Sequence, residues 1–250
     1  MDLSLQGRVA LVTGAAGDVG REIALTLATE GAAVAVNYRS SSMDAGEVVA
    51  EIAAKGGKAK AYPADVADFA AVQRMVATIV KDFGSLNILV NNAGLALRQR
   101  FVETKPEDWR RQIDTCLYGA IHCCHAAATP LEAGRDGRIV SVIGESSRVG
   151  ESGLAIVAAA RAGVVALMKS LARELGRSGT TANAVSLGLV ETAHDPAFIA
   201  ENREKLVRLY PVRRLGLPDD VAPMVALLAS PRSGWITGQV LSISGGYSMV

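Results

Sequence analysis

The sequence predicts an α/β fold, with one doubly wound parallel sheet of about seven strands and helices on both faces. Short β-branched apolar runs alternate with longer segments whose apolar residues recur at helical spacing. The alternation proceeds in single copy, without a repeat or a linker-like stretch. Half of the 250 residues are apolar, which is enough for one large core. We therefore expect a single domain over residues 1–250.

Each element follows from its local pattern. Runs such as 137–143 are β-branched and too short for a helix, so they are predicted as strands. Pro106 followed by two acidic residues suits a first helical turn, because proline needs no N–H partner there and carboxylates favour the positive end of the helix dipole. The predicted strands are 8–13, 32–38, 58–63, 86–90, 137–143, 181–187 and 239–243. The predicted helices are 21–29, 43–55, 69–83, 106–128, 154–175 and 218–229.

Two other segments carry expectations. Residues 144–153 are polar and rich in glycine, so we expect a loop at the carboxyl end of strand 137–143, where open α/β sheets place their chemistry. Helix 154–175 is apolar on nearly all sides until Arg173, so we expect it to be buried against the sheet and a partner subunit.

The composition excludes several classes of protein. The net charge is +1 with both signs spread evenly, which argues against a nucleic-acid partner. No apolar run reaches the roughly 18 residues of a membrane span, and no signal-peptide core follows the first residues. Cys116, Cys123 and Cys124 form no disulfide spacing, which favours a reducing cytoplasm.

A glycine-rich turn between the first strand and first helix indicates a dinucleotide site. Gly14, Gly17 and Gly20 would let the backbone approach a pyrophosphate, and the helix N-terminus would offer free N–H groups. The alternative is a tight turn without a ligand. The second strand ends in Arg39 and Ser40, without the acid that usually binds an NAD ribose, which favours NADP(H) over NAD(H). A solvated arginine is the alternative there.

Several motifs occur together in a familiar order. They are Thr13-Gly14 with Gly20, Asp65-Val66, Asn91-Asn92-Ala93-Gly94, Asn183-Ala184-Val185, Thr192, and Ile236-Thr237-Gly238-Gln239 before Gly245-Gly246. With them, the chain resembles the short-chain dehydrogenase/reductase family, in its 3-oxoacyl-carrier-protein-reductase-like branch. The resemblance covers the whole chain and implies a Rossmann-type fold, a homo- or hetero-oligomer of two or four subunits, and a small-molecule or acyl-thioester ligand.

The resemblance also implies cofactor-binding residues. Those of the pyrophosphate loop are Gly14, Asp18, Val19 and Gly20; those around the adenine and the middle of the cofactor are Asp65, Val66, Asn91, Ala93 and Gly94. Thr192 would bind the nicotinamide amide, and residues 188–215 would cover the substrate. Two positions depart from the family: Asp18 replaces the middle loop glycine, and Leu187 replaces the proline before Gly188. Asp18 would put a carboxylate near the pyrophosphate, so nucleotide binding could be weakened or lost.

The family reduces carbonyls with a Ser, a Tyr, a Lys and an Asn. The resemblance places these at Gly144, Val157, Arg161 and Cys116, so all four have changed. Valine has no proton to donate, and Arg161 can bond ribose hydroxyls but cannot act as a base. The family's proton transfer is therefore not expected in this chain.

Other residues near the expected pocket could act instead. Ser146 could face the pocket and Glu145 could act as an acid, the alternative being a solvated loop. His194, Asp195 and Tyr210 lie in the covering segment, where either ring could approach a ligand or remain at the surface.

The run His122-Cys123-Cys124-His125 resembles a metal motif, but adjacent helical residues point about 100° apart, so no metal is expected. Cys116 is expected to be an inert packing residue, since no cation is expected near it.

Three functions remain open. The first is a catalytically silent or structural subunit that pairs with an active homologue. The second is an NADP(H)-dependent oxidoreductase or non-redox enzyme with a different, substrate-assisted mechanism. The third is a nucleotide-sensing regulator.

Overall fold

The computed structural model describes residues 2–192 and 196–250. Its sheet has the order β3-β2-β1-β4-β5-β6-β7 with every pairing parallel, which confirms the predicted fold class. The strands are β1 (Val9–Val12), β2 (Ala33–Tyr38), β3 (Ala59–Pro63), β4 (Ile88–Asn91), β5 (Arg138–Gly144), β6 (Thr181–Leu187) and β7 (Val240–Ile243). The helices are α1 (Asp18–Thr29), α2 (Ser42–Ala54), α3 (Phe69–Phe83), α4 (Pro106–Ile113), α5 (Gly119–Ala133), α6 (Ser146–Val149), α7 (Ala155–Glu174), α8 (Pro196–Arg208) and α9 (Pro218–Ala229).

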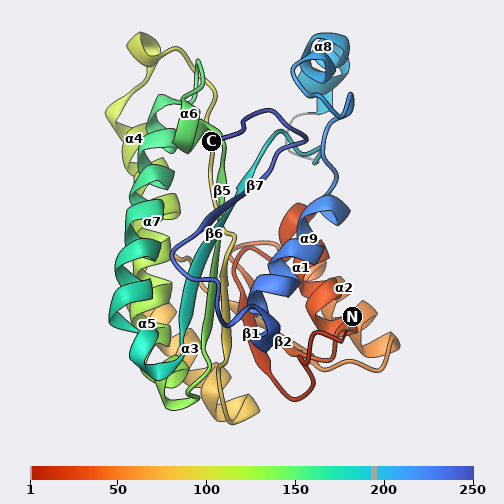
Figure 1. The fold of residues 1–250 in the computed structure, drawn as a ribbon, viewed down its shortest axis with the longest axis vertical. Coiled ribbons are helices and arrows are strands. Elements are labelled where there is room, and N and C mark those ends of the chain that lie inside the picture. Colours follow the sequence, from red (N-terminus) through yellow and green to blue (C-terminus); the bar gives the residue numbers. More distant parts are fainter. Residues whose placement is uncertain (1, 193–195) are drawn as a thin grey trace.

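The sheet is covered on both faces (Figure 1). Helices α3, α5 and α7 lie on one face, and α1, α2 and α9 lie on the other. Side chains of β1 alternate between the two layers: Val9 and Leu11 join one core, and Ala10 and Val12 join the other. A strand buried on both faces is predominantly apolar, which explains the β-branched runs of the sequence.

Three local predictions are wrong. The single helix expected over 106–128 is α4 and α5 joined by a turn of π-helix at Asp114–Tyr118. The loop expected over 144–153 contains α6. Helix α1 begins at Asp18, three residues before the predicted start, so the glycine turn runs directly into it.

Helix α7 is buried on one face only. Val164 and Met168 pack on the sheet and Val157 packs against Cys116, whereas Ala159 and Ala166 are exposed on the opposite side. By length and composition alone this helix could cross a membrane, a test that core helices of soluble proteins also pass. Its packing on β5 and β6 identifies a core helix here. The partner subunit expected on its outer face stays a prediction.

A buried arginine fixes the amino end of β5. Arg138 is 1% exposed and donates to the carbonyls of Ser230 at 3.0 Å and Gly179 at 3.1 Å. It also pairs with Asp136. Burial lowers the pKa of Arg138, and the nearby Asp136 carboxylate opposes that shift. The guanidinium thereby joins the segments that contain Asp136, Gly179 and Ser230.

We expect Arg138→Met to lower the free energy of unfolding by about 3–5 kcal/mol, because it leaves buried carbonyls without a donor. Urea denaturation followed by circular dichroism measures this. Arg177→Met, at an exposed position nearby, is the control and should change stability by less than about 0.5 kcal/mol. Equal denaturation midpoints for the two variants would contradict the role given to Arg138.

Candidate functional site

The turn between β1 and α1 accepts only glycine at two positions. Gly14 has φ +61°, and a Cβ there would lie 3.0 Å from the Cα of Ala93. A Cβ on Gly20 would lie 2.3 Å from the carbonyl oxygen of Gly14. Helix α1 therefore starts in direct contact with the turn, which brings its first N–H groups to the carboxyl end of the sheet. Asp18 adopts φ +50° at the first position of the helix.

Asn37 anchors this turn from β2. Its side chain is 1% exposed, and its Oδ1 accepts a hydrogen bond from the Gly14 N–H at 3.2 Å. Its Nδ2 donates to the carbonyls of Tyr62 and Ala64 at 3.2 and 3.1 Å. Asn37 was not among the predicted site residues. Its presence as an amide in an otherwise apolar strand could have indicated it.

Thr13 and Asn92 join the same turn to the end of β4. The Thr13 hydroxyl accepts from the backbone N–H groups of Asn92 and Ala93 at 2.9 and 3.0 Å. The Asn92 amide donates to the carbonyls of Thr13 and Gly14 at 3.0 and 3.1 Å. The roles of both residues were also missed, although both belong to motifs that the sequence displays. Because of these bonds, β1 and β4 end in one rigid unit.

The other expected cofactor residues lie along the same edge. Arg39 and Ser40 are exposed directly after β2, and Val66 is buried after β3. Asp65 accepts from the backbone N–H of Ala67 at 3.0 Å. Thr192 lines an open cleft of about 450 Å³ beside α8. The other residues lining that cleft are Asp18, Glu191, Pro196, Ile199, Ala200 and Arg203.

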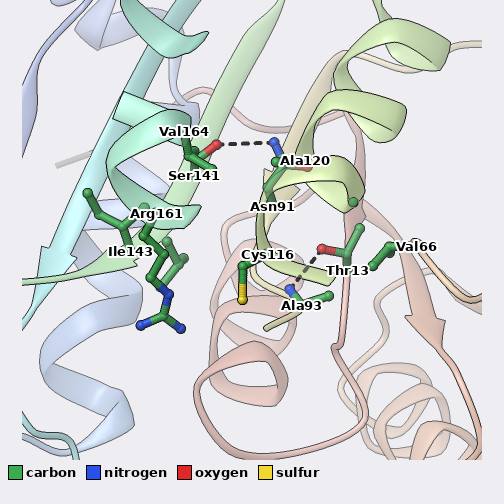
Figure 2. Close-up of a pocket in the computed structure, with 12 residues that line it drawn as sticks. Thr13, Val66, Asn91, Ala93, Cys116, Ala120, Ser141, Ile143, Arg161 and Val164 are labelled. Atoms are coloured by element: carbon green, nitrogen blue, oxygen red, sulfur yellow. Dashed lines mark hydrogen bonds between the residues drawn. The ribbon is translucent and has the colours of Figure 1, made fainter. Parts of the chain in front are cut away.

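A small cavity of about 10 Å³ lies at the carboxyl ends of β4 and β5. Figure 2 shows Arg161 entering from one side, with Cys116 and Ala93 on the other. Asn91 crosses the base, where its Nδ2 donates to Ser141 Oγ at 3.1 Å and to Cys124 Sγ at 3.3 Å. The lining residues are Thr13, Val66, Asn91, Ala93, Cys116, Gly119, Ala120, Ser141, Val142, Ile143, Arg161 and Val164.

Of the four positions that correspond to the family's catalytic residues, Cys116 and Arg161 line this cavity. Val157 and Cys116 belong to one buried apolar cluster, with Val157 0% exposed. A Cβ on Gly144 would lie 3.0 Å from Nη1 of Arg161. A Cβ on Gly94 would lie 3.1 Å from Nη2 of Arg161 and 3.8 Å from Sγ of Cys116. The guanidinium therefore lies between two glycines at the carboxyl edge of the sheet.

Cys116 is bonded to the chain after β4. Its Sγ lies 3.3 Å from both the backbone nitrogen and the carbonyl oxygen of Leu95. Its expected role as an inert packing residue stays a prediction. The π-turn carries Cys116 and sets its position beside the cavity.

The expectation of a solvated loop at Glu145 and Ser146 is wrong. Glu145 is 2% exposed, and its Oε2 accepts from the Ser248 hydroxyl at 2.6 Å. Its other oxygen has no hydrogen-bond partner in the described part of the chain. Ser146 is 6% exposed. The hydrogen-bond partner of Glu145, Ser248, lies 103 positions later in the sequence. No local sequence pattern predicts such a contact.

Of the three candidate residues in segment 188–215, the structure describes only Tyr210. His194 and Asp195 lie outside the described residues. Tyr210 is 5% exposed, stacks on Tyr247, and accepts from the Leu189 N–H at 2.8 Å through its hydroxyl. Burial is the main cause that raises the pKa of Tyr210. Its hydroxyl positions the backbone after β6.

The histidines and cysteines of α5 do not converge. His122 and His125 contact the ring of Phe69, and His122 Nδ1 lies 2.9 Å from the Val66 carbonyl. Cys123 and Cys124 are buried in the core, and burial raises the pKa of the Cys124 thiol to about 12. Among residues 2–192 and 196–250, no group of three metal-ligating side chains is found.

Comparisons with known proteins agree with this geometry. The family model described as enoyl-(acyl carrier protein) reductase matches residues 14–248. The chain belongs to the short-chain dehydrogenase/reductase family. Among relatives in this family, the 3-oxoacyl-[acyl-carrier-protein] reductase FabG of Staphylococcus aureus is 42% identical, with 96% of this chain and 98% of the relative covered.

Two further relatives extend the comparison. The (2S)-[(R)-hydroxy(phenyl)methyl]succinyl-CoA dehydrogenase subunit BbsD of Thauera aromatica is 37% identical, with 99% of each chain covered. A dehydrogenase/reductase of Sinorhizobium meliloti, known from its crystal structure, is 34% identical and superposes with a TM-score of 0.94. That comparison covers 99% of this chain and 98% of the other. The chain therefore has the fold of this oxidoreductase family over its whole length.

Gly20→Ala should destabilise the protein by about 1–3 kcal/mol, because the added methyl group would overlap the Gly14 carbonyl. Thermal unfolding measures the effect. Gly17→Ala is the matched control, since a Cβ at Gly17 meets nothing within 4 Å. Equal melting temperatures for both variants would show that α1 does not require this close approach.

Proposed function

We propose that this chain is an NADP(H)-type member of its family that lacks the family's proton-transfer residues and serves as a catalytically silent or structural subunit beside an active homologue. The observation that carries the proposal is Val157. It occupies the position expected for the catalytic tyrosine and is fully buried in an apolar cluster. A hydrocarbon there can neither donate nor accept a proton at any pH.

The other three positions support the same conclusion. Gly144 offers no hydroxyl, and Arg161 offers N–H donors but no basic acceptor for a proton. The Cys116 thiol is engaged with the backbone of Leu95. We thus propose that all four catalytic residues of the family are replaced in this chain. A single replacement could be compensated by a neighbouring side chain, but four replacements leave no such neighbour among these positions.

The residues at the carboxyl edge fit a dinucleotide. The close approach of Gly14 and Gly20 leaves room for a pyrophosphate at the start of α1, which a Cβ at Gly20 would disturb. Exposed Arg39 and Ser40 suit a 2′-phosphate, so NADP(H) is proposed over NAD(H). Arg161 would bind the nicotinamide ribose and Thr192 the amide. A bound NADPH would supply a hydride, whereas the Asp18 carboxylate would oppose pyrophosphate binding through like-charge repulsion.

We propose that the outer face of α7 forms the interface with another subunit of the family. Small apolar residues, among them Ala159, Ala162 and Ala166, are exposed there. One relative is named as a subunit of a dehydrogenase, so a chain of this type can belong to a larger enzyme. That relative acts on a CoA thioester by its name, which supports an acyl-thioester ligand for such a complex. A cytoplasmic location, without nucleic-acid or membrane partners, is part of the proposal.

A divergent enzyme is the second candidate. The buried Ser146 and the buried Glu145, with one unpartnered oxygen, favour it because both follow β5 directly. Turnover by the isolated chain that disappears in Ser146→Ala or Glu145→Gln would support this candidate over the first. A nucleotide-sensing regulator would instead bind NADP(H) without turnover and without a homologous partner.

Co-expression tests the subunit proposal. The tagged chain, produced together with each family homologue encoded in its own genome, should form a mixed complex with one of them, detected by native mass spectrometry. Ala162→Arg should reduce the yield of that complex at least 10-fold, because it puts a charge into the apolar face. Arg177→Ala, away from that face, should leave the complex intact. Recovery of the chain only as a monomer or a homo-oligomer in every pairing would contradict the proposal.

Calorimetry tests the cofactor. NADPH should bind at least 10-fold more tightly than NADH, and Arg39→Ala should abolish that preference, because the guanidinium donates charge-assisted bonds to the 2′-phosphate. Lys58→Ala, a cation at the opposite end of the neighbouring strand, is the control. Equal affinities for NADPH and NADH in the unaltered chain would overturn the assignment of NADP(H).

A further inference from the structure

The turn between β3 and α3 is held by side chains from two distant elements. Asn37 of β2 donates to the carbonyl of Ala64 at 3.1 Å. From α5, Nδ1 of His122 lies 2.9 Å from the carbonyl oxygen of Val66. A carbonyl oxygen can only accept, so Nδ1 carries a proton and His122 donates this bond. Both carbonyls of the turn therefore have partners that the turn itself does not supply.

Packing holds His122 in place for this bond. Its ring centroid lies 5.2 Å from that of Phe69, the first residue of α3. One turn earlier on α5, Gly119 lies directly on Val66, since a Cβ there would be 2.7 Å from Cγ2 of Val66. His122 is only partly buried, whereas Val66 is 5% exposed and lines the central cavity together with Thr13 (Figure 2). The hydrogen bond thus links the surface of α5 to the wall of that cavity.

The same turn presents a donor next to an acceptor. The backbone N–H of Val66 has no hydrogen-bond partner among residues 2–192 and 196–250. In a residue this buried, an N–H without a partner is rare, which indicates an acceptor on a ligand. The adjacent Asp65 supplies a carboxylate, which also accepts from the Ala67 N–H at 3.0 Å. This order suits the ring nitrogen N1 and the amino group of adenine, whereas hypoxanthine reverses it with a proton on N1 and a carbonyl oxygen beside it.

We propose that His122 is a positioning residue for adenine: by holding the Val66 carbonyl, it orients the Val66 N–H toward the base. The two peptide groups of Val66 share its Cα, so loss of the His122 bond lets the N–H turn away. His122 does not touch the nucleotide and acts only through Val66. This inference rests on the proposed dinucleotide site and adds to it a residue on α5 that determines selectivity for the base.

His125 provides the matched control. It lies one turn further along α5, and its ring centroid is 5.3 Å from that of the same Phe69 ring. Within the described ranges, it makes no hydrogen bond to the turn after β3. Replacing either histidine by phenylalanine keeps an aromatic ring beside Phe69, but only His122→Phe removes a donor from the turn.

Selectivity for the base tests the proposal, with NADPH and its hypoxanthine analogue titrated into the full chain by calorimetry. The unaltered chain should prefer NADPH at least about 10-fold. His122→Phe should reduce that preference by about 3- to 10-fold, because it removes one hydrogen bond that orients the donor. His125→Phe should keep the preference, and so should His122→Asn, since Nδ2 of asparagine takes the place of Nδ1 of histidine. A merely structural role of His122 would weaken the binding of both nucleotides alike.

Amide hydrogen exchange without nucleotide gives a second measurement. The N–H groups of Ala67 and Asp68, both bonded to Asp65, should exchange about 3- to 10-fold faster in His122→Phe and at the unaltered rate in His125→Phe. His122→Leu serves if His122→Phe does not fold by circular dichroism.

The outcomes separate this inference from the proposed function. Unchanged exchange or an unchanged preference for NADPH in a folded His122 variant would overturn the role of His122 and leave the dinucleotide site standing. Equal affinity of the unaltered chain for the two nucleotides would do the same. An unaltered chain that binds neither nucleotide would overturn the proposed dinucleotide site, and with it the selectivity assigned to His122.

Discussion

Parallel pairing of β4, β5 and β6 is the constraint on which the rest of the structure depends. Because these three strands and β1, which pairs with β4, all run the same way, their carboxyl ends meet at one edge. The turn after β1, the chain after β4 and α6 after β5 consequently lie together, although they are far apart in the sequence. Every residue considered for binding or chemistry near the central cavity owes its position to this edge.

The pocket at that edge is coherently packed. The guanidinium of Arg161 lies close to both Gly94 and Gly144, 3.1 and 3.0 Å from the positions that a Cβ would take there. Val157 closes the adjacent space with hydrocarbon and is fully buried. Arg161 and its small neighbours Gly94 and Gly144 therefore lie together at the edge of the pocket.

Much of the fold could be predicted because most buried strands are rich in apolar, β-branched residues. Strand β6 and helices α3 and α9 have the predicted bounds. The π-turn at Asp114–Tyr118 could not, since one extra residue in a helical turn leaves no signature in composition. The burial of Glu145 depends on Ser248, a contact 103 positions away in the chain. Likewise, Arg161 lies beside Gly94 and Gly144 only in the tertiary structure, since both glycines are distant from it in the sequence.

The central claim is that a hydrocarbon at position 157 removes proton transfer from this subunit. Single-turnover reduction of an acetoacetyl thioester by the isolated, homogeneous chain with NADPH tests it most directly, by absorbance of the cofactor and by analysis of the product. The account predicts no hydroxyacyl product above that formed without protein. Stoichiometric conversion of the ketone, with matching oxidation of NADPH, would contradict it.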